Sequence, residues 1–162
     1  MNHQELAQIV EQVVQAVDRS ERQTSQYADV TLDFAKRLIE AVEQKAAQMG
    51  VNAVIAVANR GANPVAVHCM DNSYIASYDI AFHKAYTCAA LKMSTTELKK
   101  LAQPGEALYG IQHTNNGKIV IFGGGIPIMI DGQCIGGLGV SGGSEEQDSA
   151  LAEYARTIIQ SL

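Results

Sequence analysis

The sequence predicts an α/β (α+β) domain in which an antiparallel sheet of about five strands is flanked by helices. Two hairpin signals predict the sheet. Residues 59–63, Asn-Arg-Gly-Ala-Asn, separate two short apolar runs as a hairpin loop, and Asp131 with Gly132 separates two more, in the pair preferred for a two-residue type I′ turn. Apolar stripes of helical period alternate with these runs, and 162 residues are enough for one packed domain.

The first 29 residues differ in composition from the remainder of the chain. Residues 1–17 are predicted to form an amphipathic helix, whose apolar stripe consists of Leu6, Ile9, Val10, Val13, Val14 and Val17. Residues 18–29 are nearly all polar or charged, which is typical of a linker. We therefore expect the globular domain at residues 30–162.

The first half of the domain begins with a helix, because the hydroxyl of Thr31 can accept from the free N–H groups of a first helical turn. A hairpin follows, and then an alanine-rich segment without Gly or Pro that is typical of a closely packed helix. The elements expected in order are a helix from Thr31 to Gly50, strands at residues 53–59 and 64–70, a helix at residues 74–92, and a short helix from Thr95 or Thr96 to Leu101.

The second half is predicted to be a three-stranded meander followed by a helix. The strands are expected at residues 118–122, 126–130 and 133–140. Ser144 and Gln147 have the spacing of a capping box, which places the start of the last helix there. The inward side of this helix is expected to consist of Leu151, Tyr154, Ala155, Ile158 and Ile159.

Gly137, Gly139 and Gly142 spell GxGxxG before this helix and raise the question of a dinucleotide site. Such a site needs a parallel strand-helix-strand unit, and the chain has room for one helix after Gly142 but for no second strand. The glycines are therefore expected to let a strand approach neighbouring backbone closely. A weaker alternative is an anion site at the N–H groups of Ser144 to Gln147, which Glu145 and Glu146 oppose.

Charge and hydropathy exclude several classes of partner. The formal net charge is -5 and the 12 Lys and Arg residues are scattered, so we expect no nucleic acid partner. The longest uncharged run, residues 119–130, is shorter than the roughly 20 apolar residues of a membrane span. No signal peptide is evident, and three cysteines without CxxC spacing suit the cytoplasm. Because 47% of residues are apolar and 18% charged, we expect a homo-oligomer.

The helix predicted at residues 74–92 holds the main candidate for a ligand site. Ile80, His83, Thr87 and Leu91 share one side of it, so an imidazole and a hydroxyl could meet a ligand there. The alternative is that Thr87 bonds back to the helix carbonyl near His83. Asp71, Asp79 and Lys84 are interpreted first as capping and ion-pair residues, and only second as acids or bases.

Other chemistry finds little support in the sequence. His68 and Cys69 are neighbours on a predicted strand and point to opposite faces, so they cannot share a metal. There is no HxxxH or CxxC pairing for zinc and no GxSxG motif for a hydrolase. We identify no catalytic residues.

Two long blocks of the sequence match known signatures. MDNSYIASYDIAFHKAYTCAALKMST resembles MDGA…DIAxxKAxTA…T, and GGGIPIMIDGQCIGGLGVSGGSEEQD resembles GGxP…DGxxxGxxGVSGGxxxxD. Both are signatures of the GlcG/HbpS family, which also occurs as the C-terminal domain of PduO, and the chain resembles this family. The resemblance covers about residues 30–162. It implies a profilin-like fold, assembly into homo-oligomers, and haem or related tetrapyrrole binding in some members.

The resemblance also implies site residues. Thr87 matches the family threonine associated with haem iron, and Lys84 matches the lysine before it. A threonine hydroxyl is a weak iron ligand, so His83 or Cys69 could supply a stronger donor. Cobalamin is a second, less favoured cofactor.

Residues 3–17 resemble the encapsulation peptides that attach cargo to bacterial microcompartment shells. A short amphipathic helix needs a groove to be stable, either on a shell protein or on its own oligomer. The leading hypothesis is thus a tetrapyrrole-binding accessory protein, expected as cargo of a microcompartment for cobalamin-dependent diol or glycerol metabolism. The alternatives are an oligomeric structural or interaction module without a cofactor, and a small-molecule enzyme with an anion site at the glycine-rich turn.

Overall fold

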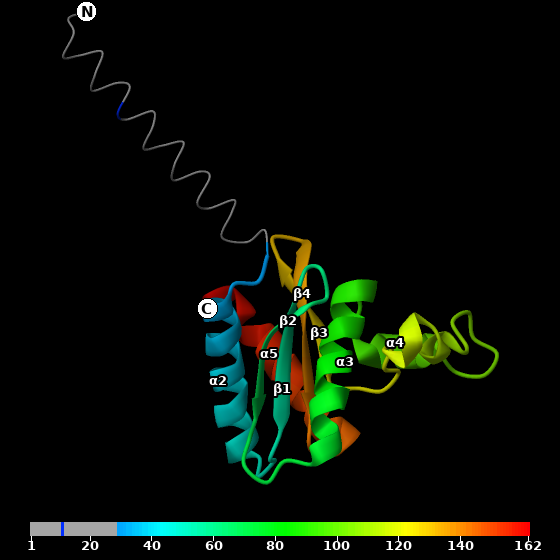
Figure 1. The fold of residues 1–162 in the computed structure, drawn as a ribbon, viewed down its shortest axis with the longest axis horizontal. Coiled ribbons are helices and arrows are strands. Elements are labelled where there is room, and N and C mark those ends of the chain that lie inside the picture. The colour runs from blue at the N-terminus through cyan, green and yellow to red at the C-terminus, as the bar shows by residue number, and fades with distance from the viewer. Residues whose placement is uncertain (1–10, 12–28) are drawn as a thin grey trace, which may run out of the picture.

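The computed structural model describes residue 11 and residues 29–162, which form a sheet with helices on both faces (Figure 1). The predicted helix at residues 1–17 and linker at 18–29 lie outside the described residues, except for residues 11 and 29. The main elements of the domain are α2 (Leu32–Gln48), β1 (Val54–Asn59), β2 (Pro64–Cys69), α3 (Ile75–Leu91), α4 (Thr95–Leu101), β3 (Gly125–Ile130), β4 (Gln133–Ser141) and α5 (Glu145–Ile158).

The described part of the chain contains one sheet of four strands in the order β2-β1-β4-β3, with all neighbours antiparallel. Both predicted hairpins are confirmed. Asp131 and Gly132 adopt φ values of 47° and 76°, as a type I′ turn requires at its two central residues. This turn joins β3 to β4, which are adjacent antiparallel strands of the sheet.

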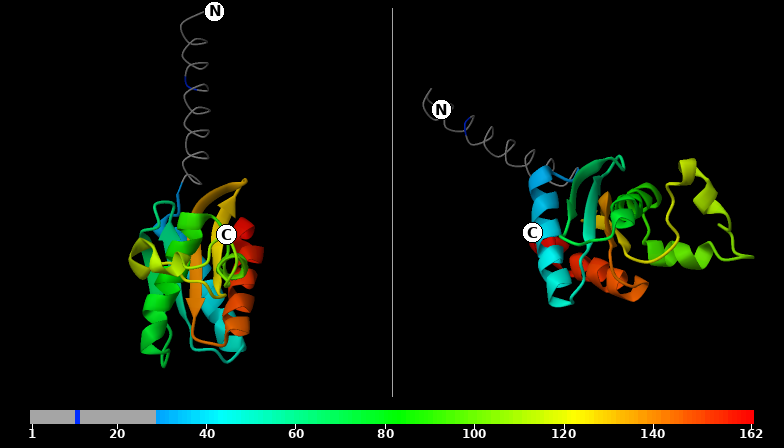
Figure 2. Two further views of the ribbon diagram at one scale, coloured as in Figure 1. Left: turned by 90° about the vertical axis from the view of Figure 1, so that its right-hand side faces the viewer. Right: turned by 60° about the horizontal axis from the view of Figure 1, so that its bottom comes forward.

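Three layers make up the domain. Helices α2 and α5 cover one face of the sheet and α3 covers the other (Figures 1 and 2). The larger cluster of buried side chains lies between the sheet and α2 with α5, and includes Leu38, Ile55, Leu138 and Leu151. The smaller cluster joins β1 to α3 and consists of Val54, Ala56, Ala58, Ala81 and Ala85. Small side chains let α3 pack close to the sheet.

Glycines of β4 complete this close packing. A Cβ atom at Gly137 would collide with the carbonyl oxygen of Ala85, and one at Gly139 with that of Ala81, both in α3. Since β4 pairs antiparallel with both β1 and β3, the crossover of a dinucleotide fold is absent around it. The interpretation of these glycines as contact positions is confirmed.

The prediction of a strand at residues 118–122 is wrong. The sheet of the described residues therefore has four strands, where about five were expected. The apolar run forms part of a loop, and one of its backbone groups bonds to a side chain of α3 instead of to a neighbouring strand. The N–H of Val120 donates to Thr87 Oγ1 at 3.0 Å. Ile119 is nevertheless buried, which explains why the pattern resembled a strand.

The remaining boundaries follow the predicted capping chemistry. Thr31 caps α2, and Ser144 and Gln147 form both bonds of a capping box on α5. Helix α4 begins at Thr95, one of the two predicted positions, and its capping box joins Ser94 to Glu97. Of the residues expected on the inward side of the last helix, Leu151, Ala155 and Ile159 are buried, the last in a 3₁₀ turn that follows α5, whereas Tyr154 and Ile158 are half-buried.

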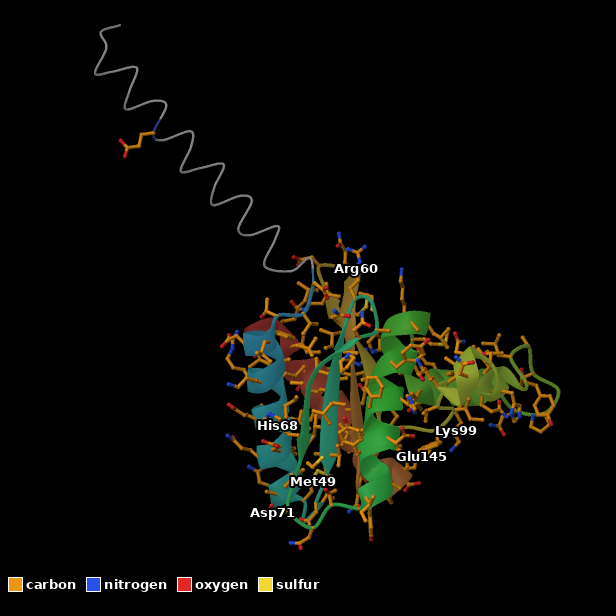
Figure 3. All side chains as sticks on the ribbon, viewed as in Figure 1. Met49, Arg60, His68, Asp71, Lys99 and Glu145 are labelled. Carbon is orange, nitrogen blue, oxygen red and sulfur yellow. The ribbon has the colours of Figure 1, made fainter. Side chains whose placement is uncertain are left out.

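An arm consisting of residues 92–124 leaves the body between α3 and β3 (Figure 1). It contains α4 and two short 3₁₀ helices, Ile111–His113 and Asn115–Gly117. Both ends of the arm are attached to the body. Gly125 N–H donates to Thr95 Oγ1, and Gly123 N–H donates to Glu145, which also binds Lys99 (Figure 3). Among the helices of the described residues, none has the length and apolarity needed to cross a membrane.

Candidate functional site on helix α3

Three of the four predicted site residues, His83, Lys84 and Thr87, lie on α3. The helix places them in different environments because consecutive side chains point in different directions around its axis. Lys84 and Thr87 are fully buried, and His83 has 20% of its side chain exposed. The helix therefore presents one of these three groups to solvent.

The hydroxyl of Thr87 is occupied by protein partners. It donates to the carbonyl oxygen of His83 at 2.7 Å, which confirms the predicted back-bond within the helix. It also accepts the N–H of Val120 from the arm at 3.0 Å. A side chain with these two bonds and no exposed surface anchors the arm to α3.

Lys84 forms a buried ion pair. Its Nζ lies 2.9 Å from Asp148 Oδ2 and 2.7 Å from the carbonyl oxygen of Val140, and the ring centroid of Phe122 is 4.9 Å away. Burial lowers the pKa of Lys84, and the nearby Asp148 carboxylate opposes this shift. The first interpretation of Lys84, as an ion-pair residue, is confirmed.

His83 is the candidate donor whose geometry suits a metal ligand. Its Nδ1 lies 3.2 Å from Asp79 Oδ2, one helical turn earlier. A carboxylate that accepts Nδ1–H fixes the tautomer and leaves the Nε2 lone pair for a metal, which is the usual support of a histidine ligand. Phe82 lies beside it, with ring centroids 5.2 Å apart.

Cys69 is at the end of β2 and is exposed. It lies in register with Val54, whose side chain packs toward α3, whereas His68 faces α2 and bonds Glu43 at 3.0 Å (Figure 3). The prediction that His68 and Cys69 point to opposite faces is confirmed. Cys69 comes from an edge strand and His83 from the outer side of α3, so they form two separate candidate donors.

The glycine-rich turn borders a cavity of about 290 Å³, lined among others by Ser77, Phe122, Glu145 and Asp148. Three backbone N–H groups of this turn already have acceptors. Gly143 N–H donates to Asp148 Oδ1, and the Ser144 and Gln147 N–H groups take part in the capping box. Carboxylates on the wall repel an anion, so the geometry does not favour the anion-site alternative.

A metal centre made of several protein ligands is not evident in the described part of the chain. No group of three or more His, Cys, Asp or Glu side chains in it is arranged to hold a metal ion. A haem needs one or two axial donors because the macrocycle supplies the other ligands. His83 with its Asp79 partner fits that requirement better than the buried Thr87 hydroxyl.

Asp148 and Asp79 were not among the predicted site residues. Asp148 is the final residue of the stretch SGGSEEQD, but nothing in the spacing of the chain joins it to Lys84, 64 residues away. The sequence indicated that Asp79 is a capping or ion-pair residue. Its position four residues before His83 on a helix is the signal that pairs the two.

The domain is thus a three-layer α/β fold with a glycine-rich antiparallel hairpin and a buried Lys84–Asp148 pair. Residues 30–157 match the model of the family described as haem degrading protein HbpS-like. The chain belongs to this HbpS-like family. The first 29 residues lie outside the match.

Two relatives and one solved structure place the chain within the family. A 15.0 kDa protein from the dhaT-dhaS intergenic region of Citrobacter freundii is 45% identical over 86% of this chain and 98% of its own length. Corrinoid adenosyltransferase PduO of Salmonella typhimurium is 40% identical over 76% of this chain but 37% of its own length. The crystal structure of the PduOC:heme complex superposes with a TM-score of 0.76 at 37% identity, covering 79% of this chain and 93% of that one.

Proposed function

We propose that this chain is a tetrapyrrole-binding accessory protein that binds haem on the outer side of α3, with a corrinoid as the second candidate. The observation that supports this most strongly is the pairing of His83 with Asp79. Membership of the HbpS-like family and the likeness to the PduOC:heme complex point in the same direction. The activity of full-length PduO is not transferred, because this chain spans 37% of it.

In this proposal, His83 would hold the iron through Nε2, with its ring oriented by Asp79. Phe82 and the neighbouring Tyr78, which is 54% exposed, offer aromatic surface to the macrocycle. When bound, haem supplies redox and small-ligand chemistry at its iron. The chain supplies the axial donor, its orientation and the apolar contact.

Cys69 is the competing donor, since a thiolate also binds haem iron and this cysteine is exposed. The full chain is titrated with haemin while the Soret band is followed. His83→Ala is expected to weaken binding at least tenfold, and His113→Ala, at an exposed histidine of the arm, serves as its matched control.

Cys69→Ala, with Cys134→Ala as its control, decides between the two donors. If only Cys69→Ala loses haemin binding, the iron ligand is Cys69 on β2 and not His83 on α3. A wild-type chain with no saturable shift for haemin or cobalamin would reject the tetrapyrrole proposal and favour the cofactor-free interaction module.

We further propose that the protein works in the cytoplasm as cargo of a microcompartment, with residues 3–17 binding a shell protein. The kinship with PduO and the amphipathic pattern of this segment support the proposal. Residues 1–24 fused to a fluorescent protein should form foci in cells that contain compartments and remain diffuse in cells that lack them. A fusion with Val10 and Val14 replaced by Asp is the control, and diffuse wild-type signal in both cells would reject targeting.

The homo-oligomer expected from composition remains part of this proposal. The observation that favours it is the exposed apolar surface of the domain, where Ile75 is 97% and Tyr74 73% exposed. Contiguous apolar patches of this kind usually mark interaction sites. Sedimentation velocity of the purified chain measures its state.

A further inference from the structure

Helix α3 has an exposed apolar ridge beside the edge strand β2. The ridge consists of Ile75, Tyr78, Phe82 and Tyr86, which follow one another at the spacing of a single helical side. Ile75 is 97% exposed and Tyr78 54%. Phe82 packs together with Val67 of β2 against the smaller core cluster, so the ridge is continuous with β2.

The composition of α3 indicates that this side is covered in the working protein. A helix exposed on one side usually carries polar residues there, whereas α3 is apolar around most of its circumference. Leaving Ile75 and Tyr78 in water forfeits the stabilisation that burial of such side chains gives. The neighbouring β2 is also an edge strand with an unpaired side, which proteins commonly shelter.

Charged residues mark the two ends of the ridge with opposite sign. Asp71 lies in the connection before α3 and is exposed (Figure 3). Asp79 lies in the second turn of α3 and is also exposed. At the carboxyl end, Lys118 Nζ lies 5.4 Å from the ring centroid of Tyr86, and Lys92 is exposed. The ridge is therefore acidic at one end and basic at the other.

We propose that the occupant of the ridge is a second copy of this chain, packed antiparallel across a two-fold axis. In that orientation the acidic end of each ridge lies against the basic end of the other, and the helix dipoles oppose each other favourably. A parallel arrangement would place like charges together. The inference rests on the homo-oligomer proposed above and names its interface. It shares Tyr78 and Phe82 with the surface proposed for the macrocycle, so association is measured on the chain without haemin.

Sedimentation velocity over a concentration series tests the interface. Ile75→Glu and Tyr78→Glu each place a charge in the ridge and are expected to convert the full chain to a smaller species. Leu32→Glu is the matched control, because Leu32 is 58% exposed on α2, on the other side of the sheet. Circular dichroism and thermal midpoints verify that all three variants are folded.

Charge reversal tests the antiparallel orientation. Asp71→Lys and Lys118→Glu are each expected to weaken association several-fold, and the double variant Asp71→Lys/Lys118→Glu to restore it. A double variant no stronger than either single one would overturn the antiparallel pairing.

The outcomes separate this inference from the broader proposal. A wild-type chain that stays monomeric at all concentrations would overturn both the homo-oligomer and the interface. A wild-type oligomer unchanged by Ile75→Glu and Tyr78→Glu would leave the oligomer standing and overturn the interface. Loss of assembly in both variants but not in Leu32→Glu supports it.

Discussion

Lys84 Nζ and Asp148 Oδ2 lie 2.9 Å apart with almost no exposed surface, and they join α3 to the start of α5. Lys84 also donates to the Val140 carbonyl oxygen, and Asp148 accepts from Gly143. The pair therefore holds the end of β4 and the residues after it between α3 and α5. The absence of a side chain at Gly124 leaves space for the Lys84 ammonium group, because a Cβ atom there would lie 2.6 Å from Lys84 Nζ.

Removing one partner of this pair should be far more damaging than removing both. Lys84→Met leaves the Asp148 carboxylate buried without a cation, which typically costs about 3–5 kcal/mol of unfolding free energy. Lys84→Met/Asp148→Leu should recover a large part of this loss, as measured by urea unfolding. A single variant as stable as the wild type would contradict the buried pairing.

Gly139 should not tolerate a methyl group. Gly139→Ala brings Cβ against the Ala81 carbonyl oxygen of α3, so helix and sheet must separate, at a cost of about 1–3 kcal/mol or more. The comparison is Gly110→Ala in the arm, where the site is open but φ is +87°, and the expected cost is about 1–2 kcal/mol. Thermal unfolding of both variants measures the two costs, and a Gly139→Ala variant as stable as the wild type would contradict tight packing at Gly139.

Thr87→Val should loosen the arm without removing the cofactor donor. Valine has nearly the same shape but cannot accept the Val120 N–H, and an unsatisfied buried group costs about 1–3 kcal/mol. Hydrogen exchange of residues 118–122 should therefore accelerate, and Thr87→Ser should behave more like the wild type. Unchanged exchange in Thr87→Val would show that the hydroxyl is not the anchor.

Acid should destabilise the arm and its attachment. The N–H and hydroxyl of Ser94 lower the pKa of Glu97, and Lys99 with the Gly123 N–H lowers that of Glu145. A folded-state pKa below the unfolded value of about 4.3 gives stabilisation that is present above that pH and lost as the pH falls through the folded pKa.

Urea midpoints at pH 7 and pH 3 measure this loss. Glu97→Gln keeps the capping geometry but does not titrate, so its stability should fall less on acidification. Glu40→Gln, at an exposed position on α2, is the control and should show the full drop. An equal drop in Glu97→Gln and the control would show that Glu97 does not contribute.

Local rules explain why most of the fold was predictable. The type I′ pair Asp131-Gly132, the Thr31 cap and the Ser144–Gln147 capping box each act within a few residues, so their effects can be recognised in sequence. Residues 118–122 were different. Their apolar pattern suited a strand, but the deciding partner, Thr87, lies 33 residues from Val120.

The candidate site was predictable only in part for the same reason. The back-bond of Thr87 and the pairing of Asp79 with His83 both follow from four-residue spacing on a helix. That Lys84 is buried against Asp148 depends on how α5 returns to α3, which no local pattern specifies. The sequence also did not reveal that one side of α3 is exposed to solvent, because an alanine-rich apolar helix has the pattern of a helix that is buried on all sides.

The most direct test of the central claim is to identify the axial ligand of the iron. Chain labelled with ¹⁵N-histidine is loaded with haemin and examined by electron-nuclear double resonance. We expect an imidazole nitrogen coupling that disappears in His83→Ala and persists in His113→Ala. A spectrum that His83→Ala leaves unchanged, or one with a thiolate signature that Cys69→Ala abolishes, would contradict the assignment of the site to the outer side of α3.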